Sequence, residues 1–446
     1  MISKAKAAFH RLTDLIKKLM KKGFFHIFTG NILVKFVNMF SVLLLPRLLV
    51  KADYGLLAYA DNIRNYLIII NGLGISNSVL RYCSITNDSS EKLGYYKLAL
   101  KMGTLANVLI TGISITSFLI IDFPVKGTKT ILIMLAGYPL LFYWFECIQF
   151  YLRANLENKK FSFLTLTNAF TMVFLQIGFG WFFQINGIII GRYISIFITI
   201  TLSIYLLKRL PYYNVKSVLS EKVNLKQFFN CGFVMMLSNL ASLMMPLNEL
   251  FLVGNILKDN NLIADYRAAS LLPQNLTLVA VSIAIFAFPH FARNSNNGKW
   301  IWAKYKKINF LLLILTIPLM LLLIVFSPII NHVIFGPAYS GAIPIMRILW
   351  VTYGVNTCFR VIAGNVLAAI GDTKFNFYNA FLSSILHLML EIYMISHFGI
   401  YGSAWGLLIV YVLSSLAANI YLKNKCEKLE RAEALEHKSR AGICNA

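Results

Sequence analysis

The chain has 446 residues, of which 58% are hydrophobic, 14% aromatic and only 13% charged, and its mean hydropathy is +0.67. Water-soluble domains of this length do not have such a composition, which argues against a disordered protein, a nucleic-acid-binding protein or an ordinary cytosolic enzyme. The net charge of +24 would suggest a nucleic-acid partner in a soluble protein, but here it reports on membrane topology.

Apolar stretches long enough to cross a bilayer recur along the chain. A hydrocarbon core of ~30 Å requires roughly 20 mainly apolar residues per helical crossing. About twelve such stretches are separated by polar, glycine-marked or proline-marked breaks. Their centres lie near Phe36, Ile70, Leu109, Phe142, Val173, Ser195, Leu243, Val279, Leu319, Val355, Leu388 and Val412. The sequence therefore predicts an all-α polytopic membrane protein without a separate soluble domain.

Five segments follow in chain order. Residues 1–22 interleave cations with leucines at helical spacing, which predicts a basic amphipathic segment on the cytoplasmic surface and not a cleaved signal peptide. We expect an N-terminal six-helix half at 23–210, a cytoplasmic linker at 211–226, a C-terminal six-helix half at 227–422 and a charged cytoplasmic tail at 423–446. Lysine and arginine favour the predicted inner segments by roughly five to one, which places both termini in the cytoplasm.

An internal repeat relates the two predicted halves. The pattern F-x-I-x-G-x-x-x-G occurs twice, about 215 residues apart, at Phe183, Ile185, Gly187 and Gly191 and again at Phe398, Ile400, Gly402 and Gly406. Lys160-Phe161 and Asp53-Tyr54 recur at nearly the same offset, as Lys374-Phe375 and Asp265-Tyr266. Two halves with six crossings each would share one orientation, with a pseudo-twofold axis along the membrane normal and a substrate site between them. The same glycine spacing also permits close helix packing.

Motifs for catalysis and for cofactors are missing. The sequence contains no phosphate-binding P-loop, no H-E-x-x-H, no G-x-S-x-G and no glycine-rich dinucleotide fingerprint. The six cysteines form no CxxC pair, so neither a zinc site nor a structural disulfide is expected. We therefore predict a protein that is not an enzyme and that has no cofactor, no metal and no catalytic residues.

Ionisable side chains within predicted spans are costly in a bilayer and are candidates for function. The cations are Lys35, Arg64, Arg192, Arg347 and Arg360, and the carboxylates are Asp61, Glu146, Glu249 and Glu391. Asn31, Lys35 and Asn38 share one helical stripe in the first span, and Asn239, Ser242, Pro246 and Glu249 share one in the seventh. Both stripes are predicted to line a cavity.

Structural roles are alternative interpretations for these residues. Asp61 and Arg64 are spaced to form a structural pair, and His387 and Glu391 lie one helical turn apart. Arg192, Arg347 and Arg360 could snorkel from span ends. The four carboxylates could couple transport to protons or sodium, or could balance buried cations. A cavity lined by the five cations would suit a phosphate or acidic sugar, because guanidinium groups bind phosphate oxygens in a bidentate fork.

Motifs along nearly the whole chain carry a resemblance to a known family. In the first half these are Gly30-Asn31, Leu45-Pro46-Arg47, Asp53-Tyr54-Gly55, Gly72-Leu73-Gly74-Ile75 and Leu80-Arg81-Tyr82. In the second half they are Ala264-Asp265-Tyr266-Arg267-Ala268, Phe288-Pro289, Phe335-Gly336-Pro337-Ala338-Tyr339, Asn365, Ala369-Ile370-Gly371-Asp372-Thr373-Lys374 and Gly399-Ile400-Tyr401-Gly402. The chain resembles Wzx-type oligosaccharide-lipid flippases, in the superfamily that also holds MATE exporters and the lipid II flippase.

This resemblance implies a MATE-like fold and a specific cargo. Such proteins move undecaprenyl-pyrophosphate-linked oligosaccharide repeat units to the outer leaflet of the bacterial inner membrane, by alternating access, for O-antigen, capsule or exopolysaccharide assembly. It also implies a monomeric transporter that works with a polysaccharide polymerase and a chain-length regulator. Two departures matter. The lipid II flippases carry two further C-terminal spans, and MATE exporters have an acidic ion-binding residue in the cavity of their N-terminal half, whereas the first span here offers Lys35.

Three classes of function stay open on the sequence alone. The first is the lipid-linked oligosaccharide flippase, and the second is a cation-coupled drug or metabolite antiporter of the MATE type. The third is a membrane glycan-processing enzyme or ligase, which would normally have a large outer loop. The predicted outer loops are short, which disfavours that class.

Overall fold

The computed structural model describes residues 24–218 and 225–444, and the predicted amphipathic segment at 1–22 lies outside them. Within the described residues every regular element is helical. Six of these helices are long and apolar enough to cross a membrane, and a bent pair inside α9 makes a seventh. The protein is therefore an all-helical, multi-pass membrane protein, as predicted.

The chain divides into two compact units, residues 1–240 and 241–446. The first unit contains α2 (Phe24–Leu48), α3 (Lys51–Ile69), η1 (Asn71–Gly74), α4 (Ile75–Ile85), α5 (Ser89–Ile120), α6 (Thr128–Leu135), α7 (Tyr138–Ala154), α8 (Asn158–Lys208) and η2 (Pro211–Tyr213). Helix α9 (Leu225–Leu257) belongs to both units and is interrupted between Leu240 and Leu243, one turn before Pro246. Proline removes a helical hydrogen bond and clashes with the preceding turn, which explains the break.

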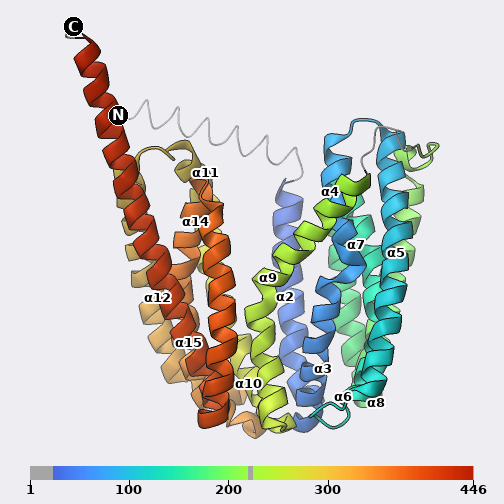
Figure 1. The fold of residues 1–446 in the computed structure, drawn as a ribbon. Coiled ribbons are helices and arrows are strands. Elements are labelled where there is room, and N and C mark those ends of the chain that lie inside the picture. The colour runs from blue at the N-terminus through green and yellow to red at the C-terminus, as the bar shows by residue number, and fades with distance from the viewer. Residues whose placement is uncertain (1–23, 219–224, 445–446) are drawn as a thin grey trace, which may run out of the picture. The chain divides into compact units, whose positions relative to one another are not determined.

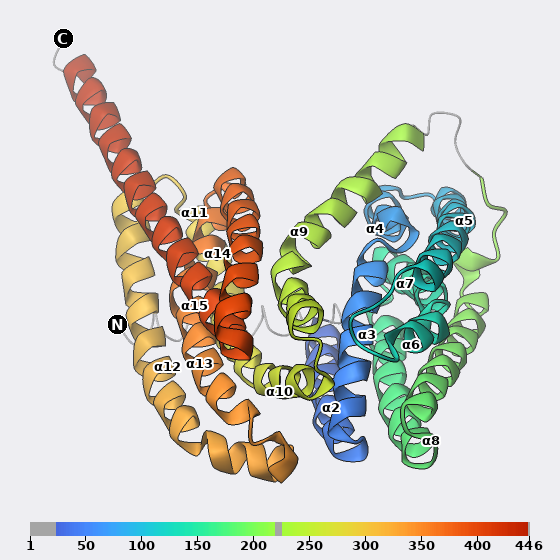
Figure 2. The same ribbon diagram turned by 60° about the horizontal axis from the view of Figure 1, so that its bottom comes forward.

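The second unit begins with the end of α9. It continues with α10 (Asn260–Leu271), η3 (Pro273–Leu276), α11 (Thr277–Arg293), α12 (Gly298–Ile334), η4 (Pro337–Tyr339), α13 (Ala342–Val355), the π-helical η5 (Asn356–Val361), α14 (Ile362–Ala369) and α15 (Thr373–Cys444). Helix α12 contains Pro318 and Pro328 and bends along its length, as Figure 2 shows. The carboxyl-terminal part of α15 continues as one helix beyond the rest of this unit (Figure 1).

Aromatic side chains fill the core of the first unit, where α4, α5 and α7 pack together. The ring of Tyr143 is fully buried and lies against Gly72 and Gly103, at both of which an added Cβ would collide with it. Its hydroxyl donates a 2.7 Å hydrogen bond to the carbonyl of Ala99. Glycine at these two positions thus lets a tyrosine occupy the space between three helices.

A left-handed turn interrupts the helical run from α3 to α4. Gly72, Leu73 and Gly74 have φ values of 54°, 51° and 73°, in the region that glycine adopts readily and leucine does not. The amide of Gly72, which has lost its helical acceptor, donates to the side-chain oxygen of Asn107 at 3.0 Å. The second predicted span is therefore a broken helix.

The predicted F-x-I-x-G repeat forms the same turn in both units. Gln184 in α8 has φ 52° and ψ −133°, and Gly399 in α15 has φ 59° and ψ −143°. At each turn the helix folds back on itself, so that an added Cβ on Gly187 or Gly402 would lie 2.0 Å from the carbonyl oxygen of Phe179 or Met394. Close packing explains these two glycines, and their identical setting supports the internal repeat.

Adding a methyl group at this turn is expected to destabilise the first unit. The Gly187→Ala side chain meets backbone, which cannot rotate away, so we expect a loss of about 1–3 kcal/mol of folding free energy. Thermal unfolding of the purified protein in detergent measures this loss. Gly178→Ala in the same helix is the control, because nothing lies within 4 Å of its added Cβ. Equal unfolding midpoints for the two variants would contradict the close approach of Gly187 to the backbone of Phe179.

Candidate functional site

A cluster of buried charges joins α3 to α8 in the first unit. The two terminal nitrogens of Arg192 donate to the two carboxylate oxygens of Asp61, with an Nη2–Oδ2 distance of 2.7 Å. The Nε of Arg192 donates to the side-chain oxygen of Gln176 at 3.2 Å. The side chain of Arg192 is only 4% exposed, so it does not snorkel to a membrane surface. Gln176 and Asp61 hold its guanidinium group in one orientation.

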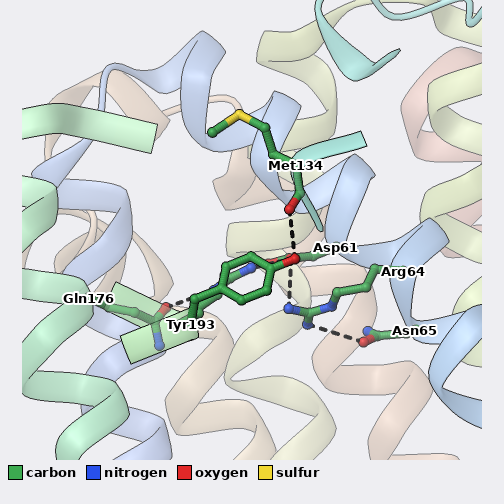
Figure 3. Close-up of polar contacts among 7 residues, drawn as sticks. Asp61, Arg64, Asn65, Met134, Gln176 and Tyr193 are labelled. Carbon is green, nitrogen blue, oxygen red and sulfur yellow. Dashed lines mark hydrogen bonds and ion pairs between the residues drawn. The ribbon is translucent and has the colours of Figure 1, made fainter. Parts of the chain in front are cut away.

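Arg64 adds a second guanidinium group to the same carboxylate. Its Nη1 lies 3.4 Å from Asp61 Oδ1, one turn earlier on α3, and its Nη2 donates to Asn65 Oδ1 at 3.4 Å (Figure 3). The guanidinium also lies over the ring of Tyr138, 5.2 Å from the centroid. The predicted pair between Asp61 and Arg64 is thus present, but it is the looser of two contacts to Asp61.

Some buried donors of this cluster make no hydrogen bond to the described residues. Nε and Nη1 of Arg64 are buried and donate no hydrogen bond to any residue in the described part of the chain. Two guanidinium groups share one carboxylate, so the described cluster carries a surplus positive charge. A buried cation is stable only when it is paired and hydrogen-bonded. The arrangement can therefore accept an anion, and phosphate oxygens match the donor geometry of a guanidinium group.

A second cluster, rich in carboxylates, lies in the second unit. Glu249 on α9 is 3% exposed and accepts a 3.0 Å hydrogen bond from the hydroxyl of Tyr266. Glu391 on α15 is fully buried and accepts a 2.5 Å hydrogen bond from Ser403, and it lies 3.3 Å from the Nε2 of His387. Glu249 and Glu391 are near enough to interact electrostatically.

This acidic cluster also has unused polar atoms. Glu249 Oε1, Glu391 Oε2 and both ring nitrogens of His387 are buried without a hydrogen-bond partner among the residues described in the structure. Carboxylates in an apolar interior are costly as anions, so binding of a proton or a cation would stabilise the site. Its chemistry is the reverse of that of the cationic cluster.

The structure describes five of the remaining candidate residues, of which Arg360 is near enough to His387 of the acidic cluster to interact with it electrostatically. Glu146 on α7 accepts a 2.8 Å hydrogen bond from Ser76. Arg360 is half-buried over the ring of Tyr411, 5.2 Å from its centroid, and Arg347 is exposed. Two polar stripe residues, Asn38 and Asn239, are exposed. The side chains of Asn31, Lys35 and Ser242 lie outside the described part of the structure.

Several residues that complete the two clusters were not predicted from the sequence. They are Gln176 and Tyr138 in the first unit and Tyr266 and Ser403 in the second. One signal was available, because Gln176 and Glu391 are separated by the same offset as the F-x-I-x-G repeat. The repeat thus has a neutral amide beside the cationic cluster and a carboxylate within the acidic cluster.

Solved structures of transporters share the fold. A multidrug resistance MATE family transporter of the MOP superfamily, in its inward-facing conformation, matches with a TM-score of 0.74 at 14% identity over 89% of this chain and 96% of that chain. The lipid II flippase MurJ, in an inward closed conformation, matches with a TM-score of 0.68 at 19% identity over 89% and 90% of the two chains. These likenesses show a MATE-like membrane-transporter fold.

Two further comparisons concern a structure and a sequence. A MOP superfamily transporter from Pyrococcus furiosus, reported with a binding pocket of reversed polarity, has a TM-score of 0.61 at 14% identity over 93% and 96% of the chains. An uncharacterized membrane protein of Methanocaldococcus jannaschii is 25% identical over 229 residues, which are 49% of this chain and 44% of that protein. The match thus spans less than half of that relative.

A family model described as polysaccharide biosynthesis protein matches residues 44–344. These residues include the cationic cluster, the break at Gly72–Gly74 and the greater part of both units. Together with the transporter fold, this match supports the resemblance drawn from the sequence motifs. The chain belongs to the polysaccharide biosynthesis protein family.

Proposed function

We propose that this chain is a flippase for undecaprenyl-pyrophosphate-linked oligosaccharide repeat units, which it moves from the cytoplasmic to the outer leaflet. The observation that carries the proposal is the surplus guanidinium of Arg64, whose buried Nε and Nη1 donate no hydrogen bond to a described residue. A pyrophosphate group would complete the cluster with charge-assisted hydrogen bonds. The family match supports a role in polysaccharide assembly.

The proposed architecture has about twelve crossings in two six-helix halves, at 23–210 and 227–422, related by a pseudo-twofold axis. The fold-back turns in α8 and α15 support this count, because each helix makes two antiparallel passes. The protein would act by alternating access in a bacterial inner membrane, as a monomer with cytoplasmic termini. A polysaccharide polymerase and a chain-length regulator would be its partners in O-antigen, capsule or exopolysaccharide assembly.

Lys35, Arg347 and Arg360 complete the proposed set of substrate-binding cations with Arg64 and Arg192. Asn31, Asn38, Asn239 and Ser242 are the proposed polar lining. Lys35→Ala is expected to impair export while leaving protein accumulation unchanged. Normal export at a normal protein level would remove Lys35 from the substrate-binding set.

Deletion of the gene in its host tests the proposal. Loss of the flippase should make unpolymerised repeat units accumulate on undecaprenyl pyrophosphate, while the matching surface polysaccharide disappears. Lipid extracts and surface glycan staining measure both. Normal surface glycan together with accumulation of toxic cations would instead identify a cation-coupled antiporter, the function that the buried acidic cluster and the MATE-like fold support.

Glu249 and Glu391 are the proposed ion-coupling residues of the second unit, because both are buried and each has an oxygen that accepts no hydrogen bond from the described residues. Glu146 has one hydrogen bond and stays a candidate, whereas Asp61 contacts two guanidinium groups, which favours charge balance. Glu391→Gln should abolish the dependence of export on a proton or sodium gradient while the cargo still binds. Glu427→Gln, an exposed carboxylate on the same helix, is the control. An unchanged gradient dependence in Glu391→Gln would exclude this role.

A further inference from the structure

A groove on the first unit lies between α5 and the beginning of α9 and shares no residue with either charged cluster. It has a volume of about 820 Å³. Apolar side chains of both helices line it, among them Leu105, Ala106 and Leu109 from α5 and Phe229 and Phe233 from α9. Leu105 and Leu109 are 55% and 60% exposed, and Phe233 is 45% exposed, so the apolar surface is open.

Specific contacts fix α9 beside the groove. Gly74 and Gly232 approach so closely that an added Cβ on either would lie within 3 Å of the other's carbonyl oxygen. The hydroxyl of Ser78 donates a 2.7 Å hydrogen bond to the carbonyl of Phe228. The left-handed turn at the broken helix places Leu73 in the groove lining, with 43% of its side chain exposed. The groove is therefore a built feature of this unit.

Cations lie at one end of the groove. Lys226 is part of its lining, next to the start of α9. Lys101 is exposed and precedes Leu105 by one helical turn, so Lys101, Leu105 and Leu109 follow one face of α5. The charge distribution predicts that this end faces the cytoplasm. From Lys226 to Phe233 the helix rises ~10 Å, which is a large part of one ~15 Å hydrocarbon leaflet.

We propose that this groove binds the prenyl chain of the lipid-linked cargo, with Lys101 and Lys226 binding its phosphate at the cytoplasmic surface. The inference rests on the proposed flippase function and adds a capture site to it. An apolar groove that ends in two lysines is complementary to a lipid with a hydrocarbon chain and an anionic head group. The same cations attract that head group before it reaches the buried arginines Arg64 and Arg192.

Binding of undecaprenyl phosphate to the full-length protein in phosphatidylcholine nanodiscs tests this site, with bound lipid measured by native mass spectrometry. Ala106→Trp fills the groove and should weaken binding about tenfold or more. Its control is Val108→Trp on the same helix, where the side chain is 52% exposed and outside the groove lining. The double change Lys101→Gln/Lys226→Gln should weaken binding about thirtyfold. Its control is Lys159→Gln, an exposed lysine elsewhere in this unit.

Three outcomes would overturn the site. They are equal losses in Ala106→Trp and Val108→Trp, no loss in the double lysine variant, and equally tight competition by phosphatidylglycerol, which would identify a site for bulk phospholipid. The lysine variants keep the test valid if Ala106→Trp fails to fold. If undecaprenyl phosphate does not bind in the groove while gene deletion still blocks export, the proposed capture site is wrong but the flippase function is supported. If deletion leaves surface glycan normal, the flippase proposal itself falls.

Discussion

Replacing Asp61 with asparagine is expected to lower the free energy of unfolding by about 3–5 kcal/mol. The carboxylate contacts both guanidinium groups of the cationic cluster, and Arg192 is 4% exposed. Removal of this negative charge leaves two buried cations that no other carboxylate among the described residues contacts. The loss should appear as a lower unfolding midpoint of the purified protein and as reduced accumulation in membranes.

Asp122→Asn is the matched control for this change. Asp122 is an exposed carboxylate in the connection between α5 and α6, so its replacement should leave the unfolding midpoint unchanged. If Asp61→Asn were as stable as Asp122→Asn, the carboxylate would not be what holds the two arginines in the first unit.

Replacing Arg64 with glutamine is expected to abolish most export without destabilising the fold, in contrast to Asp61→Asn. Arg192 and Asp61 would remain as a bidentate, neutral pair, so accumulation should stay near the wild-type level. The surplus charge and the unpartnered donors would be gone. Hydrogen bonds to charged groups contribute about 1.5–3 kcal/mol, so export should fall by about 10- to 100-fold.

Export by each variant is measured as surface polysaccharide in a deletion strain that carries the variant gene. Arg153→Gln is the control, because Arg153 is an exposed arginine of the same unit that lies over two aromatic rings. It should restore export fully. Full export by Arg64→Gln at a normal protein level would contradict a role for the surplus guanidinium in binding the cargo.

Composition and hydropathy were sufficient to predict the class of fold. Long apolar stretches can be stable only in lipid and only as helices, since the bilayer offers no water to their backbone groups. The F-x-I-x-G pattern further predicted an internal repeat, and the structure has a positive φ at Gln184 and at Gly399, within its two copies. The repeat was predictable because a fold-back between packed helices needs glycine at fixed spacing.

The break at Gly72–Gly74 was not predicted from the sequence. Two glycines within an apolar stretch are tolerated in membrane helices and by themselves do not show that the helix stops. The left-handed turn depends on tertiary partners, the side-chain amide of Asn107 and the backbone of Gly232. Both come from helices distant in the chain, so local patterns carry no signal for them.

The charged cluster was predictable only in part. Asp61 and Arg64 are three residues apart, and helical periodicity alone places them on one face. The stronger contact, from Arg192 to Asp61, joins residues 131 positions apart and needs the packing of α8 within the first unit. On the sequence alone, Arg192 could snorkel from the end of a span. The burial of its side chain excludes that alternative.

Movement of the cargo between leaflets can be measured in proteoliposomes, which gives a direct test of transport through the cationic cluster. Vesicles holding the purified protein and its undecaprenyl-pyrophosphate-linked oligosaccharide would be treated with a glycan-modifying enzyme that cannot cross the membrane. The wild type should expose the glycan of both leaflets to the enzyme, whereas Arg64→Gln should protect the inner leaflet as protein-free vesicles do. Protection by the wild type, or full exposure by Arg64→Gln, would contradict a flippase that works through this cationic cluster.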